Sequence, residues 1–260
     1  MKKITFFVAL AAATVLASGT AMAASTGLDN QTSIKGAKIG KGAKAKIGTM
    51  KVKGRYAISN SKIGAKTNVK GLRMGKGAKA TIGSTKLRNV NIRNSRVQTN
   101  TNVKNLRMGK GAKAKIGTTN LRGVNMSRSS INTTTNVKGM RMGKGARANI
   151  GNTNVRNSNL SNSKLNNRTS VKGMRMGKGA QADIGSVNLQ RSRMQNSTID
   201  NRTNVQNVRM GKGSKLKAGA IDVRNTSMRN ASIKNRTNIK GLSMGKGANV
   251  EAGTIEVGGR

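Results

Sequence analysis

The tetrapeptide Met-Gly-Lys-Gly recurs at a constant spacing of 34 residues. Its copies begin at Met74, Met108, Met142, Met176, Met210 and Met244. A loop-rich enzyme domain would accumulate insertions and lose this register, whereas stacked repeats must keep it because each unit contacts the next. We therefore expect each copy to form one turn, or a fixed number of turns, of a larger stack.

Apolar residues occupy fixed positions within the copies. The copies begin near Thr32, Thr67, Thr101, Thr135, Thr169, Thr203 and Thr237. In the second copy the large apolar residues are Val69, Met74, Ile82, Leu87, Ile92 and Val97. Later copies keep these positions while the apolar residue type varies, as a buried stack requires. We assign residues 24–31 to an N-terminal segment and residues 32–260 to the repeat domain.

Short stretches alternate between apolar and polar residues, as in residues 72–74, 78–82 and 90–92. A period of two residues is typical of β-strands, and no helical stripe of useful length emerges. The chain has no proline, so no donor is missing from a β-ladder. The sequence predicts an all-β fold, namely a β-solenoid of tandem 34-residue repeats similar to a parallel β-helix.

The sequence does not decide how many residues form one coil of the solenoid. One 34-residue coil with three faces fits the pattern, and so do two coils of about 17 residues. Ile82, Leu87, Ile92 and Val97 follow one another in steps of five residues. Over half of each copy this spacing resembles the geometry of pentapeptide-repeat solenoids, although it lacks that family's aromatic and leucine-rich centres.

Gly75-Lys76-Gly77 and its copies predict a tight turn. Two glycines allow a positive φ on both sides of Lys76, and the small Ala78 suits a crowded corner. A phosphate-binding loop is the alternative interpretation. The segment lacks the GK[ST] ending and the strand-then-helix context of such a loop, so we favour the turn.

Asparagine recurs at one repeat position. Its copies are Asn68, Asn102, Asn136, Asn204 and Asn238, with Ser170 in the remaining copy. Stacked at strand spacing, these amides would form a hydrogen-bonded ladder. The preference of asparagine for turns would explain the same recurrence, and the sequence does not choose between the two.

Cationic residues dominate the composition, with 51 Lys and Arg against 6 Asp and Glu and a formal net charge of +45. Many recur at equivalent positions and should form columns on the outside of a solenoid. The candidate polyanion-binding residues are Lys70, Arg73, Lys76, Lys79, Lys104, Arg107, Lys110, Lys113, Lys138, Arg141, Lys144, Arg147, Lys178, Lys212 and Lys246. Neighbouring ammonium groups at strand spacing repel one another unless an anion lies between them. A merely solubilising surface is the alternative.

The composition argues against enzymatic chemistry. Histidine and cysteine are absent, which removes the commonest general base, the commonest metal ligand and any disulfide. Five of the six acidic residues lie in separate stretches: Asp183, Asp200, Asp222, Glu251 and Glu256. We expect no carboxylate pair for hydrolysis or Ca²⁺ binding, and hence no enzyme activity, cofactor, metal site or small-molecule substrate.

The first residues predict export. Lys2 and Lys3 precede an apolar run over residues 4–16, and Ala21-Met22-Ala23 is typical of a cleavage site. The run is too short to span a bilayer. We expect residues 1–23 to be a bacterial signal peptide cleaved before Ala24, which places the mature chain in the periplasm, on the cell surface or outside the cell.

A leader followed by tandem Gly/Asn/Ser-rich repeats with strand-turn patterning and no proline or cysteine resembles secreted bacterial fibre subunits of the curlin kind. The resemblance is one of architecture, because curlin repeats are shorter, less cationic and carry regular Ser, Gln and Asn positions. It implies self-assembly into extracellular fibres. The acidic Glu251 and Glu256 of the last copy, against the basic first copies, would favour end-to-end stacking into a homopolymer; a degenerate cap is the alternative.

The leading functional hypothesis is a structural or adhesive surface protein that binds acidic polysaccharide, lipopolysaccharide or DNA without sequence specificity. A disordered cationic polypeptide that coats or perturbs anionic membranes is the second hypothesis. Binding to ice or minerals is a third, but Thr99, Thr101 and Thr133 to Thr135 offer only scattered hydroxyls among cations.

Overall fold

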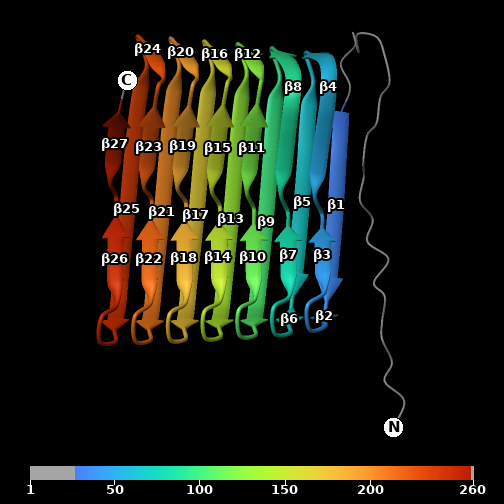
Figure 1. Ribbon diagram of the computed structural model, residues 1–260. Coiled ribbons are helices and arrows are strands. Elements are labelled where there is room, and N and C mark those ends of the chain that lie inside the picture. Colours follow the sequence, from blue (N-terminus) through green and yellow to red (C-terminus); the bar gives the residue numbers. More distant parts are fainter. Residues whose placement is uncertain (1–26, 259–260) are drawn as a thin grey trace.

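The computed structural model describes residues 27–258, and every regular element in this part of the chain is a β-strand. The strands run parallel and stack as about seven coils along one axis, as Figure 1 shows. No helix in these residues could cross a membrane. The predicted signal segment, residues 1–23, lies outside the described residues. The predicted all-β solenoid is confirmed.

One side of the solenoid is a nine-stranded sheet. Two coils contribute a pair of strands each: β1 (Gly27–Lys35) with β2 (Lys38–Ile39), and β5 (Lys62–Lys70) with β6 (Arg73–Met74). Five coils contribute one 13-residue strand each: β9 (Arg96–Met108), β13 (Ser130–Met142), β17 (Lys164–Met176), β21 (Thr198–Met210) and β25 (Ser232–Met244). Pairing starts at Gly27, within the segment that the sequence analysis set apart.

The other side consists of two sheets of short strands that follow each other along the chain (Figure 1). The seven-stranded sheet contains β3 (Lys44–Ile47), β7 (Lys79–Ile82), β10 (Lys113–Ile116), β14 (Arg147–Ile150), β18 (Gln181–Ile184), β22 (Lys215–Ala218) and β26 (Asn249–Ala252). The 11-stranded sheet contains β4 (Met50–Ser59), β8 (Thr85–Arg93), β11 (Thr119–Arg122), β12 (Asn125–Ser127), β15 (Thr153–Arg156), β16 (Asn159–Ser161), β19 (Val187–Gln190), β20 (Arg193–Gln195), β23 (Ile221–Arg224), β24 (Ser227–Arg229) and β27 (Ile255–Gly258).

The ladder register decides how each coil closes. Val103 of β9 pairs with Val137 of β13, and Ile116 of β10 pairs with Ile150 of β14. Each partner lies one full repeat away, so one 34-residue copy is one coil with three sheets. The alternative of two coils of about 17 residues is wrong, because ladder partners would then lie half a repeat apart.

The core lies between the two sides and has two apolar clusters. In one, Val103, Leu106 and Met108 of the long strand pack against Ala114 and Ile116 of β10. The other joins the first half of each long strand to the 11-stranded sheet. The six apolar positions predicted in the second copy are at most 4% exposed: Val69, Met74, Ile82, Leu87, Ile92 and Val97. The ladders and the two clusters show residues 27–258 as an ordered stack and not as a disordered chain, with buried apolar residues up to Val223.

A belt of buried polar side chains crosses the core, which the apolar pattern did not predict. Thr85 and Thr99 face each other across the coil with their hydroxyl oxygens 2.6 Å apart, and Thr119 and Thr133 repeat this pair at 2.8 Å. Because each hydroxyl both donates and accepts, the paired threonines satisfy each other away from water.

Asparagine replaces threonine in this belt in later coils. The Nδ2 atom of Asn167 donates to Oδ1 of Asn201 at 3.0 Å, and Asn201 donates to Asn235 at the same distance. Val187 stands opposite Asn201 and Ile221 opposite Asn235, and these apolar side chains need no partner. Thr153 lies at the junction between the two arrangements, and its buried hydroxyl has no hydrogen-bond partner.

The two glycines of the predicted turn have different roles. Gly77 and Gly111 have positive φ values of 67° and 65°, as expected. Gly109 does not; a Cβ there would lie 2.7 Å from the carbonyl carbon of Gly75 in the preceding coil. The prediction of positive φ at both glycines is therefore wrong for the first, which is required by close backbone stacking instead. Ala78 is fully buried, consistent with the expected crowded corner.

A second glycine column contacts the threonines of the nine-stranded sheet. Gly117 has a φ of 60°, and a Cβ there would overlap Oγ1 of Thr135 and lie 2.9 Å from its Cγ2. The same relation holds for Gly83 with Thr101 and Gly151 with Thr169. Each of these glycines therefore fixes the distance between the two sides of the coil.

Gly117→Ala should destabilise the solenoid more than Gly111→Ala. Both substitutions place alanine at a positive φ, which costs about 1–2 kcal/mol. Gly111 has open space around it, whereas Gly117 faces Thr135, so overpacking should add about 1–3 kcal/mol only there. Denaturant unfolding followed by circular dichroism measures the difference in midpoint. Equal midpoints for the two variants would contradict the role of the Gly117–Thr135 contact.

Thr153→Val and Thr119→Val should change stability in opposite directions. Valine at 153 removes a buried hydroxyl without a partner and should stabilise the chain by up to about 1 kcal/mol. Valine at 119 leaves the hydroxyl of Thr133 buried and unpaired, which should destabilise the chain by about 1–3 kcal/mol. Unfolding midpoints compare the two variants. A loss of stability from Thr153→Val equal to that from Thr119→Val would contradict this interpretation.

Candidate polyanion-binding groove

The predicted cations form four columns along the solenoid. They are Lys70, Lys104 and Lys138; Arg73, Arg107 and Arg141; Lys76, Lys110, Lys144, Lys178, Lys212 and Lys246; and Lys79, Lys113 and Arg147. All are exposed. The first two columns lie on the outer face of the nine-stranded sheet, the third at the Gly-Lys-Gly turns and the fourth on the outer face of the seven-stranded sheet. They therefore wrap around one edge of the solenoid, from the nine-stranded sheet over the turns to the seven-stranded sheet.

Like charges are direct neighbours in these columns. Lys113 pairs in register with Lys79 and with Arg147, and Arg107 pairs with Arg73 and with Arg141. Two unit charges about 4.8 Å apart repel by about 0.9 kcal/mol in water before screening by salt. A bound anion between them would remove this repulsion.

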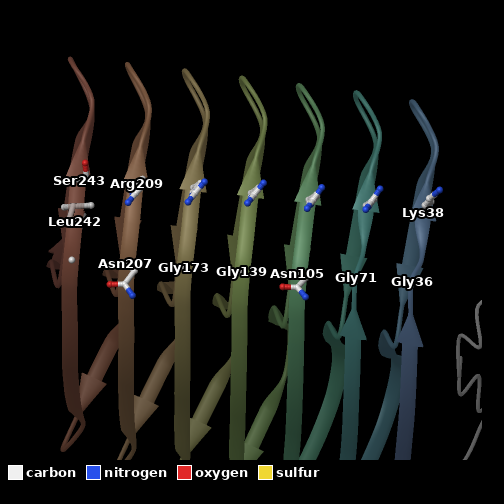
Figure 2. A pocket seen from close by; sticks show the side chains of 15 residues that line it. Gly36, Lys38, Gly71, Asn105, Gly139, Gly173, Asn207, Arg209, Leu242 and Ser243 are labelled. Carbon is white, nitrogen blue, oxygen red and sulfur yellow. The ribbon is translucent and has the colours of Figure 1, made fainter.

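A groove runs along the arginine column and crosses all seven coils. It has a volume of about 1170 Å³. Its lining combines a cationic column, Lys38, Arg73, Arg107, Arg141, Arg175 and Arg209, with a column of small residues, Gly36, Gly71, Asn105, Gly139, Gly173, Asn207 and Gly241. Figure 2 shows the cationic side chains in a row beside this column. At strand spacing, six coil-to-coil steps extend over about 29 Å.

The backbone explains why the surface is hollowed here. Gly71 and Asn105 have positive φ values of 73° and 56°, and at this point the in-out alternation of the long strand is interrupted. Lys104 and Asn105 are therefore both exposed, Leu106 turns inward and Arg107 points outward again. Small residues at the break leave space beside the arginines.

This column of small residues was not predicted from the sequence, and neither were Arg175 and Arg209 of the arginine column. One sequence feature could have revealed the column, because this repeat position holds only glycine or asparagine in all seven copies. These residue types tolerate a left-handed backbone best, so their alternation at one repeat position indicates a required conformation.

No acidic residue lines the groove. The ion pairs of the described residues lie elsewhere: Arg202 with Asp200, Lys217 with Glu251, and Arg224 with Asp222. Residues 27–258 also contain no group of His, Cys, Asp or Glu side chains that could hold a metal ion. Within the described part of the chain, none of the groove arginines therefore has a carboxylate partner.

The nine-stranded sheet carries the asparagine column on its outer face. The Nδ2 atom of Asn102 donates to Oδ1 of Asn68 at 3.0 Å, and Asn136 donates to Asn102 at 3.0 Å. These residues lie within strands, so the turn hypothesis is wrong and the ladder hypothesis is confirmed for Asn68, Asn102 and Asn136. Ser170 interrupts the ladder, and beyond it Oδ1 of Asn204 has no hydrogen-bond partner. Among the threonines considered for an ice-binding array, Thr99, Thr101, Thr133 and Thr135 are buried, which removes them from the surface.

The environment of Asp183 disfavours its charged form. Burial raises its pKa above the ordinary value of 3.8, although hydrogen bonds from Ser186 and Asn152 and the charge of Lys217 act in the opposite direction. In the same column, a hydrogen bond from Lys217 lowers the pKa of the exposed Glu251. The end of this column thus has alternating charges.

No known protein family, curated protein or solved structure matches this chain.

Asp183→Asn should remove a pH-dependent loss of stability. Because the pKa of Asp183 is raised in the folded chain, its contribution to stability is greatest below about 3.8 and is lost as the pH rises through the raised value. The unfolding free energy of the wild type minus that of the variant should therefore fall with rising pH. Denaturant titrations at a series of pH values measure this difference. A difference that rises with pH would contradict the assignment.

Proposed function

We propose that this chain is an exported, non-enzymatic structural or adhesive component of a bacterial surface or extracellular matrix. In this role it binds polyanions, such as acidic polysaccharide, lipopolysaccharide or extracellular DNA, without sequence specificity. The observation that carries the proposal is the groove in which arginines from successive coils stand in one row with no carboxylate beside them.

The chemistry of the arginine row supports a linear polyanion. Each guanidinium is permanently charged and offers a planar set of donors that matches phosphate, carboxylate and sulfate groups. The row repeats at strand spacing, so a flexible chain of anionic groups would meet a new cation at every coil. Neutralising the row would also relieve the repulsion between neighbouring coils, which favours binding further.

The remaining chemistry supports electrostatic rather than base-specific recognition. Among the residues after the predicted signal segment, the only aromatic residue is Tyr56, so base stacking along the solenoid is not available. Binding driven by charge neutralisation and counterion release depends steeply on salt and little on the sequence of the polymer. The lysine columns next to the groove would add to the attraction without defining the binding path.

Replacing Arg107, Arg141 and Arg175 by glutamine should weaken binding of heparin or single-stranded DNA more than a matched change elsewhere. The matched variant replaces Arg88, Arg122 and Arg156, which are exposed on the 11-stranded sheet outside the groove. Both variants lose the same net charge. Retention or titration across a salt series should give a shallower dependence of log affinity on log salt for the groove variant, by roughly two to three units relative to the wild type.

Equal losses of affinity in the two variants would show that only the total charge matters, and would contradict the groove as the binding path. Affinity that does not respond to salt would contradict polyanion binding altogether. Circular dichroism of both variants checks that the strands are intact.

A further inference from the structure

The two ends of the solenoid are chemically unlike. At the C-terminal end, β25, β26 and β27 each have a paired neighbour on one side only, and Leu242, Met244, Ile255 and Val257 are 36%, 48%, 50% and 68% exposed. At the other end the outer edges of β1, β3 and β4 likewise have no paired neighbour among residues 27–258, while Ile39, Met50 and Val52 are at most 9% exposed. Uncovered strand edges with exposed apolar side chains favour pairing with another chain.

The ladder columns connect each residue of the last coil to one residue of the first. The column that ends at Glu251 passes through Lys217, Asp183, Asn149, Lys115 and Thr81 and starts at Lys46. The column that ends at Glu256 passes through Asp222, Asn188, Asn154, Asn120 and Lys86 and starts at Lys51. The column that ends at Lys234 passes through Asp200, Asn166, Asn132, Gln98 and Gly64 and starts at Asp29.

From these columns we infer that a second copy of this chain stacks on the first, its N-terminal coil in register on the C-terminal coil. Glu251 would then lie beside Lys46 of the next copy, Glu256 beside Lys51 and Lys234 beside Asp29. Three of the six acidic residues of the chain thus stand at its ends, and each faces a lysine across the junction. A single register makes all three pairs.

The same register matches the rest of the coil. Met244 would stack in the column of Ile39, Ile255 in that of Met50 and Val257 in that of Val52. Three other columns are cationic over most of their length but end in a neutral residue in the last coil. In the stacked register these neutral residues would meet lysines of the next copy: Ser243 against Lys38, Asn249 against Lys44 and Gly258 against Lys53. Like charges meet at two places, Lys240 against Lys35 in the strands and Lys246 against Lys41 in the Gly-Lys-Gly turns.

The junction continues three of the four strand positions of a coil. β25 would meet β1 and β2, β26 would meet β3, and β27 would meet the first half of β4. Within residues 27–258 the last coil has no counterpart of β24, so the junction keeps a notch one strand wide. The backbone ladders supply adhesion, and the three ion pairs select the register and the polarity.

The test uses two charge-reversed chains. One carries Glu251→Lys and Glu256→Lys, and the other carries Lys46→Glu and Lys51→Glu. Each alone would place like charges across the junction, so end-to-end association should weaken by roughly tenfold or more relative to the wild type. An equal mixture should restore association, because each C-terminal end of one chain then meets the opposite charge on the other.

The chain is first purified in high salt, which removes bound polyanions. Its association is then measured at low salt by sedimentation velocity and negative-stain electron microscopy. A control with Lys86→Glu and Lys115→Glu makes the same charge change in the same two columns, but on coils away from either end of the solenoid. This control should associate as the wild type does. The Lys46→Glu/Lys51→Glu chain leaves the Lys217–Glu251 ion pair in place, which keeps the test independent of fraying in the last coil.

A wild type that stays monomeric, reversed chains that associate as well as the wild type, or a mixture without recovery would each overturn the proposal. Association of the Lys46→Glu/Lys51→Glu chain at the wild-type level would place the first coil outside the junction. The measurement contains no polyanion, so its outcome is separate from that of the groove variants.

Discussion

The parallel ladder that joins each coil to the next is the interaction on which the rest of this structure depends. Backbone amides of one coil donate to carbonyls one repeat away, as Gly109 does to Met74 at 2.8 Å. Because the pairing is parallel and free of insertions from the second coil onward, one translation along the axis generates every coil from its neighbour. The ladder must also outweigh the repulsion of a chain with a formal net charge of +45.

This translation requires that each inward side chain fit beside its own equivalents. Gly109 stacks on Gly75 so closely that neither position has room for a Cβ. In the polar belt, the change from threonine to asparagine is accompanied by a change to valine or isoleucine on the opposite strand. Each Nδ2 of the amide column donates to the next Oδ1 along the axis, whereas a threonine needs its partner across the coil. Only the first acceptor of the column, Oδ1 of Asn167 opposite Thr153, has no partner. The orphaned hydroxyl of Thr153 marks the coil where the exchange is half complete.

On the outside, the same translation has an electrostatic consequence. A cation that suits one coil is repeated in the next, so the surface acquires rows of like charge with a groove beside the arginine row. In the last coil the lysine rows continue at Lys240 and Lys246, whereas neutral Ser243 and Asn249 replace the cations of the other two rows. A polyanion in the groove would neutralise the row of arginines along the axis. A second copy stacked on the end would pair the charged residues of the last coil with those of its own first coil.

Much of the fold was predictable because the signals are periodic. The 34-residue spacing gave the repeat, the alternation around Ile82 gave strands, and the recurrence of Lys76 and Arg73 gave outward columns. The coil closure was not predictable, since apolar steps of five residues fit one long coil and two short ones equally. The groove was also missed, because it arises from a backbone break at Gly71 and Asn105 and not from any chemical motif.

The sequence by itself determined that equivalent residues lie in register, with apolar side chains inside and cations outside, because periodicity and hydrophobic burial need no knowledge of the path of the chain. Only the tertiary structure decided which residues face each other across a coil and between its two ends. Thr85 opposite Thr99, Gly117 against Thr135, and the columns that lead from Lys46 to Glu251 all depend on where the chain turns. Those turns are set by local backbone conformation and close packing, which similar residue patterns satisfy in more than one way.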